Sequence, residues 1–344
     1  MIEIDGSYGE GGGQILRTAV AMSILTGEDV KIRNIRANRP NPGLRAQHLT
    51  ALKALQMISD AKAEGLHIGS SWVNFSPGKI KGGSYKLDIG TAGSITLVFQ
   101  SILLASLQTE KELTFKVRGG TDVKWSPSWD YFTEVFIPLL SKFGFEVEGK
   151  LLRRGFYPKG GGEVEVIVHP TGRLKSFQVL EQEYRSIEGR IAVSKLPNHV
   201  GERTKQAILR KAISYDVRID IERADDALSE GVVATLWSKS GETVVGSTML
   251  GEKGLPSEKL GSMCIDELIK EVESKVSLDV HAADQLLPYM AFVASHYGEK
   301  STFLVRELSN HARTNMWLIE KFLPVKFITE GKGNVLRVEV VKSS

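Results

Sequence analysis

The sequence has very little of what stabilises a secreted, membrane-spanning or zinc-bound protein. It contains one cysteine, Cys264, which excludes an internal disulfide and suits a reducing compartment. Its seven histidines are scattered and leave no zinc-ligand spacing. No uncharged apolar run reaches membrane-spanning length, and the strand pattern at Met1–Ile4 predicts no signal peptide. We therefore expect a cytoplasmic protein without membrane contact.

A strong charge of one sign is also missing. The net charge is only +3, with 42% apolar and 25% charged residues, as in a globular protein. This mildly basic balance is compatible with nucleic acid or nucleotide phosphates without indicating either. The 344 residues are enough for two domains, or for one large domain that carries an insertion.

Periodic patterns recur three times in the order β-α-β-α-β-β. The first copy predicts strands at 2–5, 30–35, 64–67 and 71–75, with helices at 14–26 and 44–59. The second predicts strands at 85–89, 113–117, 146–153 and 162–169, with one helix at 94–107 and another that ends near Phe143. The third predicts strands at 277–280, 302–306, 325–329 and 335–341, with helices at 283–296 and around His311. Repeats of this length favour a pseudo-threefold arrangement over a solenoid.

The residues between the second and third copies break this rhythm. They predict strands at 187–194, 217–222, 232–238 and 243–249, and helices at 202–212 and 257–275. We expect an α/β (α+β) protein in which three βαβαββ units form a large domain and a smaller α/β domain is inserted. The predicted boundaries are 1–179 for the first two units, 180–276 for the insertion and 277–344 for the third unit.

The most informative stretch surrounds His311. Ser309 and Asn310 are good N-cap residues, apolar residues follow at helical spacing, and Pro324 ends the pattern. His311 is thereby placed in a first helical turn, where free N–H groups favour a neutral imidazole and attract phosphate. A neutral histidine beside a phosphate can attack phosphorus as a nucleophile. The alternative is a histidine that merely hydrogen-bonds near a helix cap.

Other polar residues also fall where predicted strands lead into helices. Ligands gather at such positions because helix N-termini point free N–H groups there. The candidates are Glu10, Gln14, Arg17, Arg39, Arg45, Gln47, His48, Thr91, Ser94, Gln100, Asp122, His281, Asp284, Gln285, Asn310 and His311.

Several of these residues have two explanations. Glu10 stands in a glycine-rich turn that lacks P-loop spacing; it suits a magnesium ligand beside phosphates or a helix dipole partner. Arg17 and Arg39 could bind phosphate or be solvated, although two prolines stiffen the Arg39 loop. Trp125 and Trp129 could stack a nucleobase, while core packing explains both as well.

Longer motifs resemble RNA 3′-terminal phosphate cyclases. They are Gly9–Arg17 (GEGGGQILR), Arg39 with PGLRAQHL at 42–49, GTAGS at 90–94 with Gln100, RGFYPKGGG at 154–162, ADQL at 283–286, and His311 ahead of FLPV at 322–325. The matches extend from residue 2 to about 340 and are jointly specific. The inserted region matches more loosely.

The resemblance implies an ATP-dependent enzyme that converts an RNA 3′-phosphate into a 2′,3′-cyclic phosphate and releases AMP and pyrophosphate. His311 stands at the position of the histidine that forms a covalent histidine–AMP. Glu10 corresponds to the contact for Mg²⁺ or Mn²⁺, Arg17 and Arg39 to phosphate clamps, and Gln47 to a further active-site residue. The adenosine site corresponds to Gln14, Gln100, Pro127, His281, Asp284 and Gln285. His281 departs from the tyrosine of some relatives.

Two alternatives from other classes follow. Some members of this family lack the nucleophile and act in ribosomal RNA processing, but His311, Glu10, Arg17 and Arg39 are all present here. Enolpyruvyl transferases share the repeat architecture, yet their own motifs are absent. The resemblance further implies RNA with a 3′-phosphate and ATP as partners, and family habit favours a homodimer.

Overall fold

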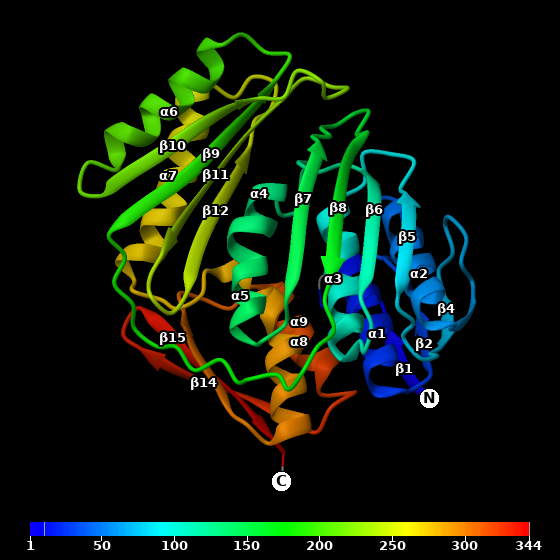
Figure 1. Ribbon diagram of the computed structural model, residues 1–344. Coiled ribbons are helices and arrows are strands. Elements are labelled where there is room, and N and C mark those ends of the chain that lie inside the picture. Colours follow the sequence, from blue (N-terminus) through cyan, green and yellow to red (C-terminus); the bar gives the residue numbers. More distant parts are fainter. Residues whose placement is uncertain (10, 344) are drawn as a thin grey trace.

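A computed structural model describes residues 1–9 and 11–343. Within this part of the chain, four β-sheets surround and flank a group of packed helices (Figure 1). No helix of these residues is long and apolar enough to cross a membrane.

The first sheet contains strands β1 (Ile2–Asp5), β2 (Val30–Arg33), β4 (Val73–Ser76) and β3 (Lys62–Glu64), in that order. β1 and β2 run parallel, and the other neighbours are antiparallel. Helices α1 (Gly13–Thr26) and α2 (Ala46–Ser59) connect the strands. α1 ends where Gly27 adopts a left-handed φ of 74°, a conformation that glycine reaches without a steric penalty. The predicted β-α-β-α-β-β order is confirmed.

The second sheet repeats this arrangement. Its order is β5 (Gly83–Asp88), β6 (Leu113–Gly119), β8 (Gly162–Val168) and β7 (Val147–Arg153), again with one parallel pair. Its helices are α3 (Ile95–Ala105), extended by the 3₁₀ turn η1 (Ser106–Gln108), and then α4 (Trp129–Tyr131), the π-helical η2 (Phe132–Phe136) and α5 (Ile137–Lys142). The second predicted helix of this unit is therefore present, with a π-helical segment in its middle.

The third unit has three described strands, and one predicted strand is wrong. It comprises α8 (Val280–Tyr297), β13 (Ser301–Val305), α9 (Asn310–Ile319), β14 (Val325–Lys332) and β15 (Val335–Lys342), with sheet order β13-β15-β14. Residues 277–280, predicted as a strand, form no ladder. The amides of Ser277 and Leu278 both donate to the Leu304 carbonyl, and Asp279 caps α8 by accepting from the amides of His281 and Ala282.

The residues between the second and third units form a separate sheet of order β10-β9-β11-β12. Its elements are β9 (Ser186–Ser194), α6 (His199–Lys211), β10 (Asp216–Arg223), β11 (Gly231–Lys239), β12 (Val244–Leu250) and α7 (Ser257–Glu273). The four strands and two helices predicted here are confirmed. The sheet and its helices enclose their own apolar cluster, which includes Ile191, Leu236 and Leu268, and they lie at the upper left in Figure 1.

Helices α1, α3, α8 and α9 meet in the interior, and this arrangement positions the candidate site. α3 is buried on most of its surface because it packs against α1, α2 and α8. α9 packs against both α1 and α8. These helices carry about half of the polar residues singled out in the sequence.

Candidate active site

His311 lies in the first turn of α9, as the sequence predicts. The helix is capped by Ser309, whose Oγ accepts a hydrogen bond from the Ala312 amide at 3.0 Å. The same hydroxyl donates to Asp284 Oδ1 at 2.6 Å, which ties α9 to α8. The His311 side chain is half-buried, and its carbonyl accepts from Gln14 Nε2 at 3.4 Å. Three of the predicted site residues, Gln14, Asp284 and His311, are thus brought together.

The glycine-rich turn before α1 packs directly on α9. Gly9 has φ +58°, and a Cβ added to it would stand 2.4 Å from Thr314 Oγ1. The Tyr8 ring stacks on the Trp317 ring with centroids 3.8 Å apart. The turn therefore lies beside the His311 helix. Glu10, the predicted metal contact, lies outside the described residues, and its role stays a prediction.

Arg17 points its charge into a buried position on α1. Its exposed fraction is 8%, and its Nε has no hydrogen-bond acceptor among residues 1–9 and 11–343. Burial lowers the pKa of Arg17 to about 10, a value at which the guanidinium is still charged at neutral pH. A buried cation that its described neighbours leave incompletely paired favours an arriving anion.

His48 is a structural neighbour of Arg17. Its Nδ1 accepts from the Arg45 amide at 3.2 Å and caps α2. Burial, followed by the charges of Arg17, Arg36 and Arg45, lowers the pKa of His48 to about 3, so the imidazole is neutral. A Cβ on Gly13 would lie 2.1 Å from His48 Nε2, which makes glycine necessary at the start of α1.

The predicted phosphate and adenosine residues lie on neighbouring elements. An Arg39 guanidinium nitrogen lies 3.4 Å from the position of an added Gly12 Cβ, so Arg39 reaches the glycine-rich turn. Gln47 Oε1 accepts from the Ser94 amide at 3.0 Å, at the N-terminus of α3. Gln100 Nε2 donates to Gln285 Oε1 at 2.9 Å.

Further contacts complete the adenosine candidates. Gln285 Nε2 donates to the carbonyl of His281 at 3.0 Å, and the His281 side chain is exposed. The Pro127 carbonyl accepts from Thr96 Oγ1 at 2.9 Å, which fixes its loop to α3. The described candidates therefore lie on α1, α2, α3, α8 and α9 and in the loops that carry Arg39 and Pro127.

Sequence reasoning missed two polar residues that hold this group together. Asn315 Nδ2 donates to the Asp284 carbonyl at 2.9 Å, and Thr18 Oγ1 donates to Asn315 Oδ1 at 3.3 Å. Both side chains are buried. The available signal was the position of Asn315, one helical turn after His311 on the side that the apolar pattern buries.

The two tryptophans near Pro127 differ sharply. Trp129 is 2% exposed and belongs to the main apolar core, which confirms core packing for this residue. Trp125 is 94% exposed, so core packing is wrong for it. Its loop does not continue the helical pattern, because α4 begins only at Trp129.

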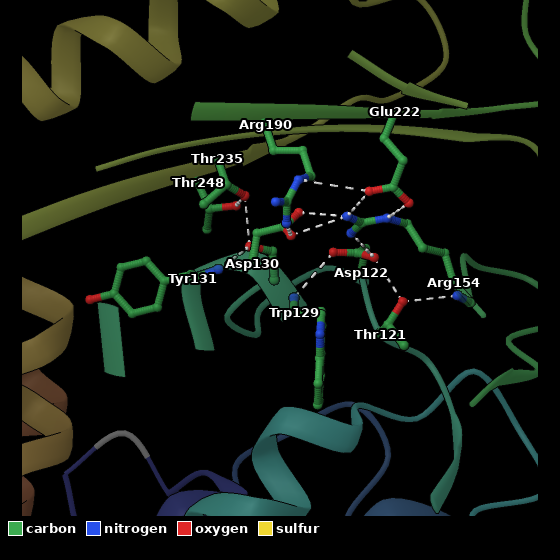
Figure 2. Close-up of polar contacts among 12 residues, drawn as sticks. Thr121, Asp122, Trp129, Asp130, Tyr131, Arg154, Arg190, Glu222, Thr235 and Thr248 are labelled. Carbon is green, nitrogen blue, oxygen red and sulfur yellow. Dashed lines mark hydrogen bonds and ion pairs between the residues drawn. The ribbon is translucent and has the colours of Figure 1, made fainter. Parts of the chain in front are cut away.

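Arg154, from the RGFYPKGGG run, forms a charge network that the sequence did not reveal (Figure 2). It is 1% exposed. Its Nη1 donates to Asp122 Oδ2 at 3.1 Å, and its Nη2 donates to Asp130 Oδ2 at 2.8 Å and to Glu222 Oε2 at 2.7 Å. Arg190 Nη1 adds a second bond to Asp130 at 2.6 Å. Burial alone would lower the pKa of Arg154, but these carboxylates raise it well above its usual range.

Within the described residues, no group of three or more His, Cys, Asp or Glu side chains could hold a metal ion. The described site is instead rich in cations and amides, a donor set that matches phosphate oxygens.

A histidine at a helix N-terminus beside buried and loop-borne arginines is the arrangement of a phosphate-handling α/β enzyme. The family model of RNA 3′-terminal phosphate cyclase matches residues 8–329. The chain belongs to this family.

Curated relatives agree over the full length. The chain is 45% identical over 350 residues to the RNA 3′-terminal phosphate cyclase of Methanopyrus kandleri, covering 99% of this chain and 98% of the relative. It is 44% identical over 362 residues to the protein of that name from Methanosarcina mazei, with 99% and 100% covered. It is 43% identical over 349 residues to the one from Pyrococcus furiosus, with both chains fully covered.

Proposed function

We propose that this chain is an ATP-dependent RNA 3′-terminal phosphate cyclase that works through a covalent His311–AMP. The observation that carries the proposal is the position of His311, in the first turn of α9 and bonded through its carbonyl to Gln14. Family membership and the full-length relatives support the overall activity. The substrate is RNA with a 3′-phosphate, and the products are a 2′,3′-cyclic phosphate, AMP and pyrophosphate.

The reaction consists of three displacements at phosphorus. An imidazole nitrogen of His311 attacks the α-phosphorus of ATP, so that a P–N bond forms and the bond to pyrophosphate breaks. An oxygen of the RNA 3′-phosphate then takes the adenylyl group and releases His311. Finally the neighbouring 2′-hydroxyl attacks the activated phosphate, loses its proton, and expels AMP. Transfer of the adenylyl group gives the RNA 3′-phosphate a good leaving group, AMP. The RNA 3′-phosphate, otherwise a poor electrophile, thereby becomes reactive.

We assign the supporting roles from the contacts described above. Arg17 and Arg39 stabilise the phosphates as charge develops on them, and Gln47 lies beside the transferred group at the N-terminus of α3. Gln14, Gln100, Pro127, His281, Asp284 and Gln285 line the adenosine. The hydrogen bonds among Gln100, Gln285 and the His281 backbone support a common wall.

In this scheme Mg²⁺ or Mn²⁺ is coordinated mainly by the phosphates of ATP rather than by a set of protein ligands. Mg²⁺ commonly binds through one or two carboxylates together with substrate phosphates and water, so it does not require a group of three or more protein ligands, which the described residues do not contain. When bound, the ion neutralises phosphate charge. Glu10 is the residue that we propose to hold it.

Other parts of the proposal rest on the sequence alone. We propose a large domain formed by 1–179 and 277–344 and an inserted domain at 180–276, a homodimer, and a cytoplasmic location. A noncatalytic role in ribosomal RNA processing is the competing function. It is less favoured because His311 is present and helix-capped.

The test is covalent labelling with ATP that carries the label on its α-phosphate, in the presence of Mg²⁺. We expect label on the native protein and none on His311→Asn. The matched control is His199→Asn, because His199 is the first residue of α6 and also lies at a helix N-terminus. The bond should be acid-labile and base-stable, as a phosphoramidate is. Label should then move to RNA that carries a 3′-phosphate. A folded native protein that takes no label would overturn the catalytic proposal.

A further inference from the structure

Two aromatic side chains are exposed on loops beside the proposed site. Trp125 is 94% exposed and Tyr157 is 74% exposed. Trp125 also adopts φ +60°, a left-handed conformation that is unfavourable for a bulky residue. A tryptophan in this state adds almost nothing to the core and strains the backbone. Its position is better explained by a ligand than by folding.

The two loops that carry these rings are joined at their bases. Asp122 and Phe156 pair in an isolated parallel β-bridge. The amides of Thr121 and Asp122 both donate to the Gly155 carbonyl, at 2.9 and 3.2 Å. Residues 121–128, the Trp125 loop, and residues 155–161, the Tyr157 loop, therefore form one continuous surface element.

The buried charge network connects the bases of these two loops, and Figure 2 shows its contacts at Thr121, Asp122 and Arg154. Arg154 bonds to Asp122 and so connects the residue before the Tyr157 loop to the start of the Trp125 loop. Thr121 Oγ1 donates to Asp122 Oδ2 at 2.7 Å and accepts from the Gly155 amide at 2.8 Å. Both rings thus project from a rigid base, and less conformational entropy is lost when a partner binds them.

The element borders the proposed active site. A Cβ added to Gly160 would lie 2.7 Å from Ala92 Cα, so the Tyr157 loop packs against the turn that leads to Ser94. The Ser94 amide in turn donates to Gln47. The other loop carries Pro127, which is bonded to α3. Lys159 lies in the Tyr157 loop and is exposed, and its amide donates to Ser229 Oγ at 3.1 Å.

We propose that Trp125 and Tyr157 stack the bases of single-stranded RNA behind its reacting 3′-end, with Lys159 at the adjacent phosphates. This inference rests on the proposed function. Aromatic rings bind any base through its π-face, and neighbouring cations follow the backbone, which is how single strands are bound without sequence preference. The candidates for the adenosine wall lie mainly on α1, α3 and α8, and only Pro127 belongs to the Trp125 loop, so two rings and a lysine on adjoining loops exceed the needs of one adenine.

The test measures the affinity of a short fluorescent RNA with a 3′-phosphate for the full-length protein. We expect Trp125→Ala and Tyr157→Ala each to weaken binding by about tenfold and the double variant by more, with Trp125→Phe close to native. Trp72→Ala is the matched control, because Trp72 is 40% exposed and lies in another loop. Covalent labelling by ATP in the absence of RNA measures the first step, the proposed formation of His311–AMP, separately from RNA binding.

The outcomes separate the possibilities. Trp125→Gly guards against misfolding, because glycine adopts φ +60° readily; it should be at least as heat-stable as native protein and bind RNA as weakly as Trp125→Ala. Native RNA affinity in both variants would overturn the proposal. Normal RNA affinity with weaker ATP labelling would assign Trp125 to adenine instead. If native protein takes no label from ATP, the proposed function fails, while the dependence of RNA affinity on the rings is still measurable.

Discussion

Arg17 and Arg154 are both buried, but their surroundings differ. Arg154 bonds to the carboxylates of Asp122, Asp130 and Glu222, and these raise its pKa above the usual range. Arg17 has an Nε without an acceptor in the part of the chain that the structure describes, and burial lowers its pKa to about 10.

The difference separates a structural charge from a ligand-binding one. A buried ion is tolerated when other groups compensate it, and removing its partner is then strongly destabilising. A buried ion without full compensation reduces stability unless a ligand supplies the missing charge. On this basis Arg154 maintains the fold, whereas Arg17 suits the phosphate-binding role that we propose for it. Substitutions at the two positions should therefore affect different measurements.

The largest effect is expected for Arg154→Met. The substitution leaves Asp122 buried without its cation and leaves Asp130 with Arg190 alone, which should reduce the free energy of unfolding by about 3–5 kcal/mol. Urea unfolding measures this change, with Glu222→Gln as a milder variant if the first does not fold. Arg203→Met removes only the exposed ion pair with Glu258 and should change stability far less than Arg154→Met, because water screens an exposed ion pair. Equal losses in both variants would contradict a structural role that is specific to Arg154.

Arg17→Met should leave the fold intact and damage the chemistry. We expect covalent labelling to slow by about 10²- to 10³-fold, as for the loss of one preorganised charge donor, with a melting temperature at or above that of native protein. Pyrophosphate should raise the melting temperature of native protein and not that of the variant. The distinction between the two arginines fails if Arg17→Met unfolds as readily as Arg154→Met.

Gly13→Ala tests the packing around Arg17. The new methyl group would overlap His48 Nε2, and His48 is too buried to move freely, so we expect a loss of about 1–3 kcal/mol in stability together with slower labelling. Gly172→Ala is the control, because a Cβ there meets nothing within 4 Å. A Gly13→Ala variant with native stability would show that His48 can shift.

A further prediction is a pH dependence from His48. Its pKa is about 3 in the fold and about 6.5 in the unfolded chain, so the unfolded state binds more protons between these values. Stability should therefore fall as pH drops from 6.5 towards 3, by at most about 1.4 kcal/mol per pH unit. Unfolding of native protein and His48→Asn across this range isolates the contribution. If the difference in stability between native protein and His48→Asn does not change with pH, the predicted contribution of His48 is contradicted.

Local patterns predicted much of the fold and part of the site. The Ser309 cap and the first-turn position of His311 followed from residues adjacent in the sequence. Residues 277–280 were misassigned because their amides bond to the distant Leu304 carbonyl and because Asp279 acts as a cap. Neither interaction leaves a periodic signal.

The remaining surprises depend on contacts between distant segments. Arg154 meets Asp122 and Glu222 from different sheets, and no local spacing predicts that meeting. Trp125 resembled a core residue because aromatic residues near a helix start are usually buried. Its exposure follows from a loop conformation that a single sequence does not encode in any short motif.

The bond between Gln14 and the His311 carbonyl spans 297 positions of the chain, and this has a consequence for biosynthesis. During translation, α1 with Arg17 leaves the ribosome long before α9 exists, and domains generally fold as they emerge. A chain interrupted before residue 277 would contain Arg17 and Arg39 but not His311. If His311 is the nucleophile, as we propose, incomplete products would be unable to trap AMP, and the covalent chemistry would begin only when nearly the whole chain has been made.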